Sequence, residues 1–214
     1  MDIEAIRAEA LTCTKCRLAE TRTQVVWADG NLDSEVCIIG EAPGFNEDKQ
    51  GEPFVGAAGQ LLNRLLEGIG LRREDVYIAN VIKCRPPNNR DPAQDEVDSC
   101  KDYLRAQITL IDPNVVVTLG NFATKLLMRT ETGITRLRGR SYPWWQGRVL
   151  IPTYHPAAAL RSGERLIGEM QSDFSLVREE LSKPRITAAP AQQDVSDSEA
   201  PRTEEDPEQM NLFA

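Results

Sequence analysis

The sequence contains a single histidine and no apolar run long enough to cross a membrane. One histidine cannot form a multi-histidine metal site. The first ten residues, MDIEAIRAEA, carry acids and lack the apolar core of a signal peptide. We therefore expect a cytoplasmic, monomeric protein with no membrane partner, in which the five cysteines serve as metal ligands or reactive thiols rather than as disulfides.

An overall basic composition is also missing, because the formal net charge is −8. The charge is unevenly distributed, however. Residues 184–214 hold seven acids and two arginines, whereas residues 129–165 hold seven arginines and two glutamates, and KCRPPNNR (83–90) adds three bases and no acid. A polyanion could therefore meet a basic face on this acidic protein, with solvated surface charge as the alternative interpretation.

The glycine-rich stretch GEAPGFNEDKQGEPFVGAAGQLL (40–62) lacks the Lys and Ser/Thr pattern of a nucleotide-binding P-loop. It lies between an expected strand and an expected helix. Gly56 and Gly59 would let backbone N–H groups approach a phosphate of another kind. The alternative is that both glycines only allow tight packing between strand and helix.

Short apolar segments alternate with helical patterns along the chain. The expected strands are β-branched and apolar on both faces, as buried parallel strands are, and they cover 35–40, 75–81, 113–120 and 148–154. Expected helices include a Leu/Ile stripe at 61–69 and the segments 91–111, 121–128 and 164–181. This alternation predicts a three-layer α/β/α sandwich with a central four-stranded parallel sheet, in one domain of residues 1–183.

The helix expected at 91–111 begins with a recognisable start signal. Asp91 is the expected N-cap, Pro92 takes the first helical position, and Gln94 completes a capping box. This pattern places the helix start at Pro92.

Polar residues follow three of the expected strands. Glu41 follows the first strand, Asn80 ends the second, and His155 comes directly after the fourth. Because ligands bind beyond the carboxyl ends of parallel strands, we expect these side chains to meet at one edge of the sheet. For His155 the alternative is a helix-capping or buried polar residue. In TYHPAAALR (153–161), Leu160 and Arg161 would add a wedge and a charge.

Four of the five cysteines form two separated pairs, namely Cys13 with Cys16 and Cys84 with Cys100. Two such pairs of thiolates can build one tetrahedral site for zinc or for a four-iron four-sulfur cluster. The spacing alone does not choose between the two metals. Cys37, within VCIIG, is most simply a small buried hydrophobic residue.

Four motifs together carry a resemblance to a known family. GEAPG, PFVG, IANVIKCRPPNNR and HPAAALR, with the four paired cysteines, closely resemble the family 4 uracil-DNA glycosylases, the iron–sulfur branch of that superfamily. The resemblance covers about residues 11–182. It implies a monofunctional enzyme that flips uracil out of DNA, hydrolyses the N-glycosidic bond and leaves an abasic site. It favours the 4Fe-4S cluster over zinc in the four-cysteine site.

The resemblance also implies roles for single residues. The Asn80 amide would pair with uracil, the Phe54 ring would stack on it, and His155 would donate to its O2 atom. For Phe54, a core aromatic under a glycine turn is the alternative. Gly40, Ala42 and Asn89 would contribute to the same pocket. The DNA would contact Gly56, Gly59, Arg85, Leu160 and Arg161.

The water-positioning residue is less defined. In family 1 enzymes the corresponding motif is Gly-Gln-Asp-Pro-Tyr, and this sequence carries Ala42 and Gly44 at the places of the aspartate and the tyrosine. Glu41 and Glu47 are the nearest carboxylates for that water, and the loop backbone could also hold it. Glu47 is alternatively a wall that excludes a 5-methyl group.

The C-terminal end returns to an apolar pattern after an acidic stretch. Residues 184–208 predict a disordered linker. Residues 209–214 resemble the short peptides that bind the bacterial DNA sliding clamp, through Gln209, Met210, Leu212 and Phe213; the alternative is a sticky chain end.

Two other functions are weighed against the glycosylase. One is a non-catalytic DNA-binding module with a structural zinc. The other is a protein that bonds covalently to uracil-DNA through a histidine on an insertion after the second strand. The loop RPPNNRDP (85–92) is short and has no histidine, which counts against the covalent trap.

Overall fold

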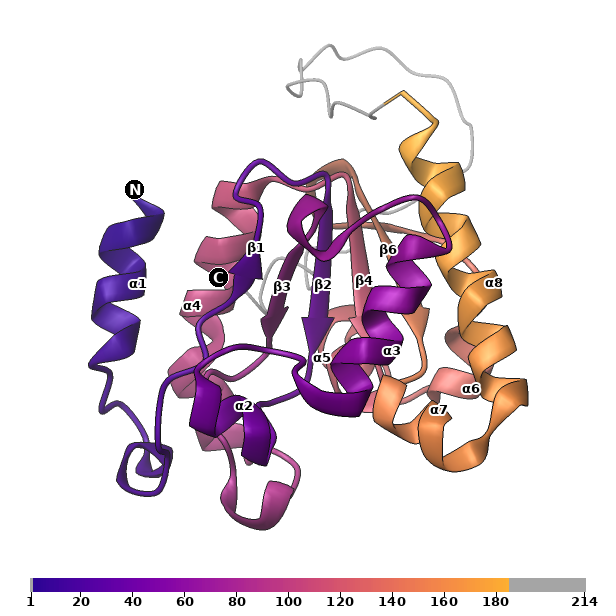
Figure 1. Cartoon of the computed structure of the whole chain (residues 1–214). Coiled ribbons are helices and arrows are strands. Elements are labelled where there is room, and N and C mark those ends of the chain that lie inside the picture. The colour runs from indigo at the N-terminus through magenta and orange to yellow at the C-terminus, as the bar shows by residue number, and fades with distance from the viewer. Residues whose placement is uncertain (1, 185–214) are drawn as a thin grey trace, which may run out of the picture.

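A computed structural model describes residues 2–184 of the chain. Its centre is a six-stranded sheet in the order β1-β3-β2-β4-β6-β5. The four inner strands run parallel, and they are β3 (Tyr77–Asn80), β2 (Val36–Gly40), β4 (Val115–Leu119) and β6 (Arg148–Thr153). The four predicted strands are therefore confirmed (Figure 1).

Two short edge strands were not predicted. β1 (Asp29–Gly30) pairs antiparallel with β3, and β5 (Tyr142–Trp144) pairs antiparallel with β6. Each is too short to show an apolar period. The sheet is therefore mostly, but not wholly, parallel.

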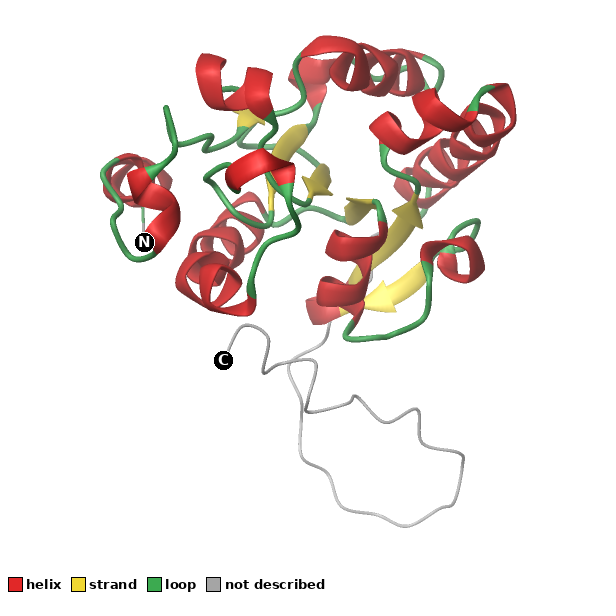
Figure 2. Cartoon of the chain, turned by 90° about the horizontal axis from the view of Figure 1, so that it is seen from below, coloured by secondary structure: helices red, strands yellow, loops and turns green. Residues whose placement is uncertain are grey.

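Helices cover both faces of the sheet, as Figure 2 shows. Alternate strand residues point to opposite faces, so Cys37 and Ile39 pack on one side and Val36 and Ile38 on the other. The first side is covered by α1 (Ile3–Leu11), α4 (Gln94–Ile111) and α5 (Asn121–Met128). The second side is covered by α3 (Gly56–Glu67), α7 (Pro156–Ser162) and α8 (Glu164–Leu181). The predicted three-layer sandwich is confirmed.

Two further short helices lie in the connections, α2 (Phe45–Gln50) after β2 and α6 (Ile134–Leu137) before β5. Short 3-10 turns cover Arg17–Glu20, Arg73–Asp75, Pro87–Asn89 and Trp145–Gly147. Within residues 2–184, no helix combines the length and the apolar character that crossing a membrane requires. The expected linker and clamp-binding peptide, from residue 185 on, lie outside the described residues and stay predictions.

The start of α4 differs from the prediction. The helix begins at Gln94 with Ala93 as its N-cap, so the assignment of Asp91 as N-cap and Pro92 as first residue is wrong. The reason is Glu96, a fully buried carboxylate that accepts a hydrogen bond from the Ala93 N–H at 2.9 Å. Arg90 and Arg17 both bind the same carboxylate and hold its pKa at about 2, with the Arg90 hydrogen bond as the largest cause.

Candidate active site

A cavity of about 400 Å³ lies at the carboxyl ends of the parallel strands, the edge that faces the reader in Figure 2. It is lined from segments that are far apart in the sequence. Eight of the predicted site residues take part, namely Glu41, Ala42, Glu47, Phe54, Asn80, Asn89, His155 and Arg161. The other lining residues were not among the predicted site residues, and they are Pro43, Gly44, Ala58, Pro86, Arg90 and Ala157. Each of these lies close in sequence to a predicted site residue, and this closeness could have identified them as lining residues.

Asn80 ends β3 with its side chain buried, only 2% exposed. Its Oδ1 atom accepts no hydrogen bond from any residue that the structure describes. Leaving a buried acceptor unpaired costs about 1–3 kcal/mol, and such groups in native proteins call for a functional explanation. The cavity supplies one, because a ligand with an N–H group could satisfy this oxygen.

Gly40 makes room for the amide. It is the register partner of Asn80 in the neighbouring strand β2. A Cβ atom at Gly40 would overlap Asn80 Oδ1 and would lie 2.5 Å from Cζ of Phe54. Gly40 is not itself part of the cavity wall, but only glycine lets this amide and this ring approach each other.

The Phe54 ring is held by a strained and well-anchored loop. The residue has φ of +52°, a left-handed conformation that is uncommon for a bulky side chain. Arg73 binds the backbone here, with Nη1 donating to the Phe54 carbonyl at 3.2 Å and Nη2 to the Pro53 carbonyl at 2.5 Å. Asp29 in turn accepts from Arg73 Nε at 2.5 Å. The ring is thus both a core residue and part of the cavity wall.

Gly59 explains the tight turn under this ring. A Cβ atom at Gly59 would overlap the carbonyl oxygen of Phe54, and the residue is buried. Tight packing, the alternative to phosphate binding, is therefore sufficient to explain a glycine at this position. Gly56 is exposed at the start of α3 with φ of +70°. Arg85 and Leu160 also lie outside the cavity wall.

His155 caps helix α7, which was the alternative considered for it. Its Nδ1 atom accepts a hydrogen bond from the Ala157 N–H at 3.2 Å. A neutral imidazole that accepts through Nδ1 carries its proton on Nε2, so this ring offers one donor. Burial, with a smaller effect of Arg161, lowers the pKa of His155 to about 4, which keeps the ring neutral near pH 7. The ring centroid lies 5.6 Å from that of Phe54.

The two candidate carboxylates have different surroundings. Burial raises the pKa of Glu41 to about 7, and the nearby Asp91 adds to the shift. Glu47, on α2, accepts a hydrogen bond from the Val55 N–H at 3.0 Å and so fastens α2 to the loop that carries Phe54. A carboxyl group with this pKa can gain or lose a proton near neutral pH, whereas the hydrogen bond of Glu47 is a structural contact.

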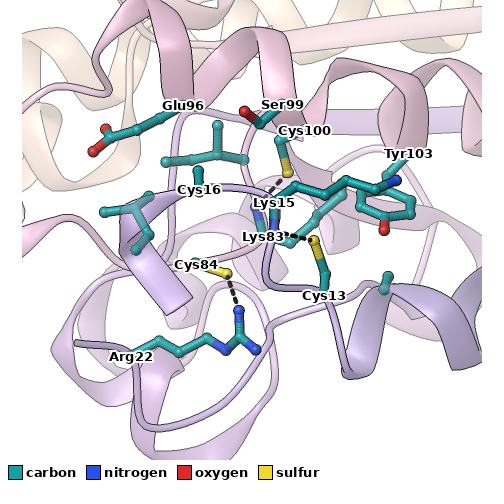
Figure 3. A pocket seen from close by; sticks show the side chains of 13 residues that line it. Cys13, Lys15, Cys16, Arg22, Lys83, Cys84, Glu96, Ser99, Cys100 and Tyr103 are labelled. Carbon is teal, nitrogen blue, oxygen red and sulfur yellow. Dashed lines mark hydrogen bonds between the residues drawn. The ribbon is translucent and has the colours of Figure 1, made fainter. Parts of the chain in front are cut away.

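The four paired cysteines line a second cavity, which Figure 3 shows. Three of their sulfur atoms accept hydrogen bonds: Cys13 from the Lys15 N–H at 3.5 Å, Cys84 from Arg22 Nη1 at 3.4 Å and Cys100 from the Lys83 N–H at 3.3 Å. Over residues 2–184, no group of three or more His, Cys, Asp or Glu side chains is placed to hold a metal ion as it stands. Cys37 is fully buried in the sheet, away from this cavity.

Lys83 connects the two cavities. Its side chain is buried, and Nζ donates to the Asn80 carbonyl and to Gln107 Oε1, both at 2.6 Å. Its backbone N–H is the donor to Cys100. Burial lowers the pKa of this lysine to about 8. One residue thus contacts both the backbone of the candidate base-reading asparagine and a sulfur of the four-cysteine site.

Comparison with known families agrees with this geometry. Residues 27–182, which include the whole cavity wall, match the family described as the uracil DNA glycosylase superfamily. The chain belongs to this superfamily. The superfamily match does not include Cys13 and Cys16, which precede it.

Curated relatives within the uracil DNA glycosylase superfamily match most of the chain. The type-4 uracil-DNA glycosylase of Archaeoglobus fulgidus is 47% identical over 192 residues, which cover 86% of this chain and 96% of that protein. That of Sulfurisphaera tokodaii is 45% identical and covers 86% of each chain. That of Thermotoga maritima is 47% identical over 75% of this chain and 84% of its own.

The close approach of Gly59 to Phe54 gives a first prediction. Replacing Gly59 by alanine should lower the free energy of unfolding by about 1–3 kcal/mol, because the new methyl group overlaps a backbone oxygen that Arg73 holds in place. Gly68→Ala is the matched control, since Gly68 has φ of −60° and its Cβ would make only ordinary contacts at 3.4 Å. Urea denaturation measures both, and equal stability of the two variants would contradict the packing explanation.

Proposed function

We propose that this protein is a uracil-DNA glycosylase of base excision repair, which binds extruded uracil in the 400 Å³ cavity, hydrolyses its N-glycosidic bond and leaves an abasic site. The observation that carries the proposal is the buried, unpaired Oδ1 atom of Asn80 beside the Phe54 ring. The proposal is also supported by the superfamily match and by the relatives, which are named type-4 uracil-DNA glycosylases.

Base recognition follows from the chemistry of the Asn80 amide. Oδ1 accepts from uracil N3–H, and the amide NH₂ donates to uracil O4. Cytosine presents a donor and an acceptor in the reverse order and would leave both amide atoms unpaired, at a cost of about 1–3 kcal/mol. The Phe54 ring stacks on the base, a contact worth about 1–3 kcal/mol.

Bond cleavage needs stabilisation of the negative charge that develops on the departing base. His155 donates from Nε2 to uracil O2 in the manner of an oxyanion hole. Because the ring is neutral, the hydrogen bond strengthens as charge develops, while no positive charge has to be buried in the resting enzyme.

Glu41 is the residue to which we assign the attacking water. Its pKa of about 7 makes it ionised in a large fraction of molecules at neutral pH, and it lines the cavity. The carboxylate orients the water and accepts its proton as the water bonds to the sugar carbon. Glu47 keeps α2 and the Phe54 loop together and forms a cavity wall that a 5-methyl group would meet.

The four-cysteine site suits an iron–sulfur cluster. Hydrogen bonds to the ligand sulfurs are typical of iron–sulfur sites, and three of the four sulfurs here accept one. When bound, the cluster would join residues 13–16 to residues 84–100 as a structural tie, with no part in hydrolysis.

The proposal extends to the C-terminal tail on the sequence alone. Residues 209–214 would recruit the enzyme to DNA by binding a bacterial sliding clamp, and unchanged clamp affinity after their deletion would reject this role.

The enzymatic proposal predicts release of free uracil from an oligonucleotide. Asn80→Ala and His155→Ala should each lower kcat/KM by at least about a hundredfold, which corresponds to the loss of a hydrogen bond formed in the transition state. Asn63→Ala is the matched control, since Asn63 Oδ1 is also buried and unpaired among the described residues but lies on α3, outside the cavity. Tight binding of uracil-DNA by the wild type without release would instead support the non-catalytic alternative.

The raised pKa of Glu41 predicts a pH dependence. Protonation removes the acceptor for the water, so kcat/KM should fall about tenfold per pH unit below about 7. His155, with a pKa of about 4, does not titrate in that range. Glu41→Gln should be slow and nearly independent of pH there, whereas Glu47→Gln should retain the slope. An unaltered slope in Glu41→Gln would assign the water to another group.

The cluster predicts a brown protein that contains iron and acid-labile sulfide. Cys84→Ala should lose the colour, because one of four ligands is missing, and Cys37→Ala should keep it, because Cys37 lies apart from the site. Visible absorption and metal analysis measure both. A colourless wild type with one zinc per chain would decide for zinc.

A further inference from the structure

Two exposed large apolar side chains are direct sequence neighbours of residues in the cavity wall. Within residues 2–184, the exposed large hydrophobic side chains are Leu11, Leu32, Phe45 and Leu160. Phe45 is 50% exposed and directly follows Gly44, a residue of the cavity wall, while Leu160 is 38% exposed and directly precedes Arg161, another. Figure 1 shows their helices, α2 and α7, at the lower left and lower right of the molecule. Leu160 was predicted as a wedge, whereas Phe45 has no role so far.

Phe45 stands among cations. Lys49 Nζ lies 4.3 Å from the centroid of its ring, and the guanidinium carbon of Arg85 lies 5.1 Å from it. Arg85 is positioned in turn, because its Nε atom donates to Asn89 Oδ1 at 2.7 Å, and Asn89 lines the cavity. We call Phe45, Lys49 and Arg85 the Phe45 patch. It is continuous with the cavity through Gly44 and Asn89.

This combination of groups selects a type of ligand. An exposed aromatic ring offers a flat face on which a nucleobase can stack. Lys49 and Arg85, the two cations that lie over this half-exposed ring, suit the phosphate that accompanies each base. An aliphatic partner surface would use the ring but not the charges, and a free anion would use the charges but not the ring.

We propose that the Phe45 patch is a binding subsite for the nucleotide next to the extruded uracil, on the α2 side of the cavity. Phe45 stacks on its base, and Lys49 and Arg85 bind its phosphate. A base that is paired and stacked in a duplex has no free face, so the subsite acts on single-stranded or locally opened DNA. The inference rests on the proposed glycosylase function.

The test compares KM for a single-stranded oligonucleotide with one central uracil. Phe45→Ala should raise KM about tenfold, in keeping with the loss of one stacked base. Phe45→Trp, which keeps a flat ring, should stay close to the wild type. Leu32→Ala is the matched control: Leu32 is 44% exposed, and it follows β1 near Gly30, which pairs with Tyr77 at the start of β3, the end of the sheet away from the cavity. Equal KM values for Phe45→Ala and Leu32→Ala would overturn the proposal.

A spectroscopic test locates the stacked base. An abasic oligonucleotide with 2-aminopurine beside the abasic site should lose fluorescence on binding the wild type and Phe45→Trp, and should lose much less on binding Phe45→Ala. Equal quenching by the alanine variant would overturn the proposal. Failure of the wild type to release uracil would reject the glycosylase function itself, whereas release with an unchanged KM in Phe45→Ala rejects only the subsite.

Discussion

Both cavities depend on the hydrogen bonds of one buried residue, Lys83. A charge inside a protein is stable only where acceptors surround it, and here the Asn80 carbonyl and Gln107 provide them. The ring of Trp27, 5.7 Å away, adds a favourable cation–π contact. Lys83 therefore fixes the chain where it leaves β3. The Asn80 amide precedes this point, and Cys84 follows it.

The fold was predictable where local pattern and tertiary structure agree. Buried parallel strands have apolar residues on both faces, so four short runs were sufficient to find the sheet centre, and the ranges of α5 and α8 agree with the predicted 121–128 and 164–181. The edge strands have no such pattern. The start of α4 depends on Glu96, which accepts from the nearby Ala93 N–H and Arg90 and also from Arg17. Arg17 is 79 residues away in the sequence, and no local pattern contains that last contact.

The candidate site was predictable to the extent that topology brings strand ends together. Glu41, Asn80 and His155 meet because parallel strands end at the same edge of the sheet. The residues that hold the site in place could not be predicted in this way. Arg73 holds the carbonyl of Phe54 from 19 residues away, and its sequence neighbours carry no sign of this role. The motif named Phe54 but gave no indication of its left-handed backbone.

The helix cap at His155 limits what this imidazole can do. Since its second nitrogen is already engaged by the amide of Ala157, the ring has no lone pair left with which to take up a proton. In the proposed mechanism His155 therefore stabilises the leaving base without shuttling a proton to it, and the base would depart as an anion. The rate of base release would then depend on the stability of the leaving anion as well as on the shape of the base. A base whose anion delocalises its charge poorly would be released slowly even when it fits the cavity.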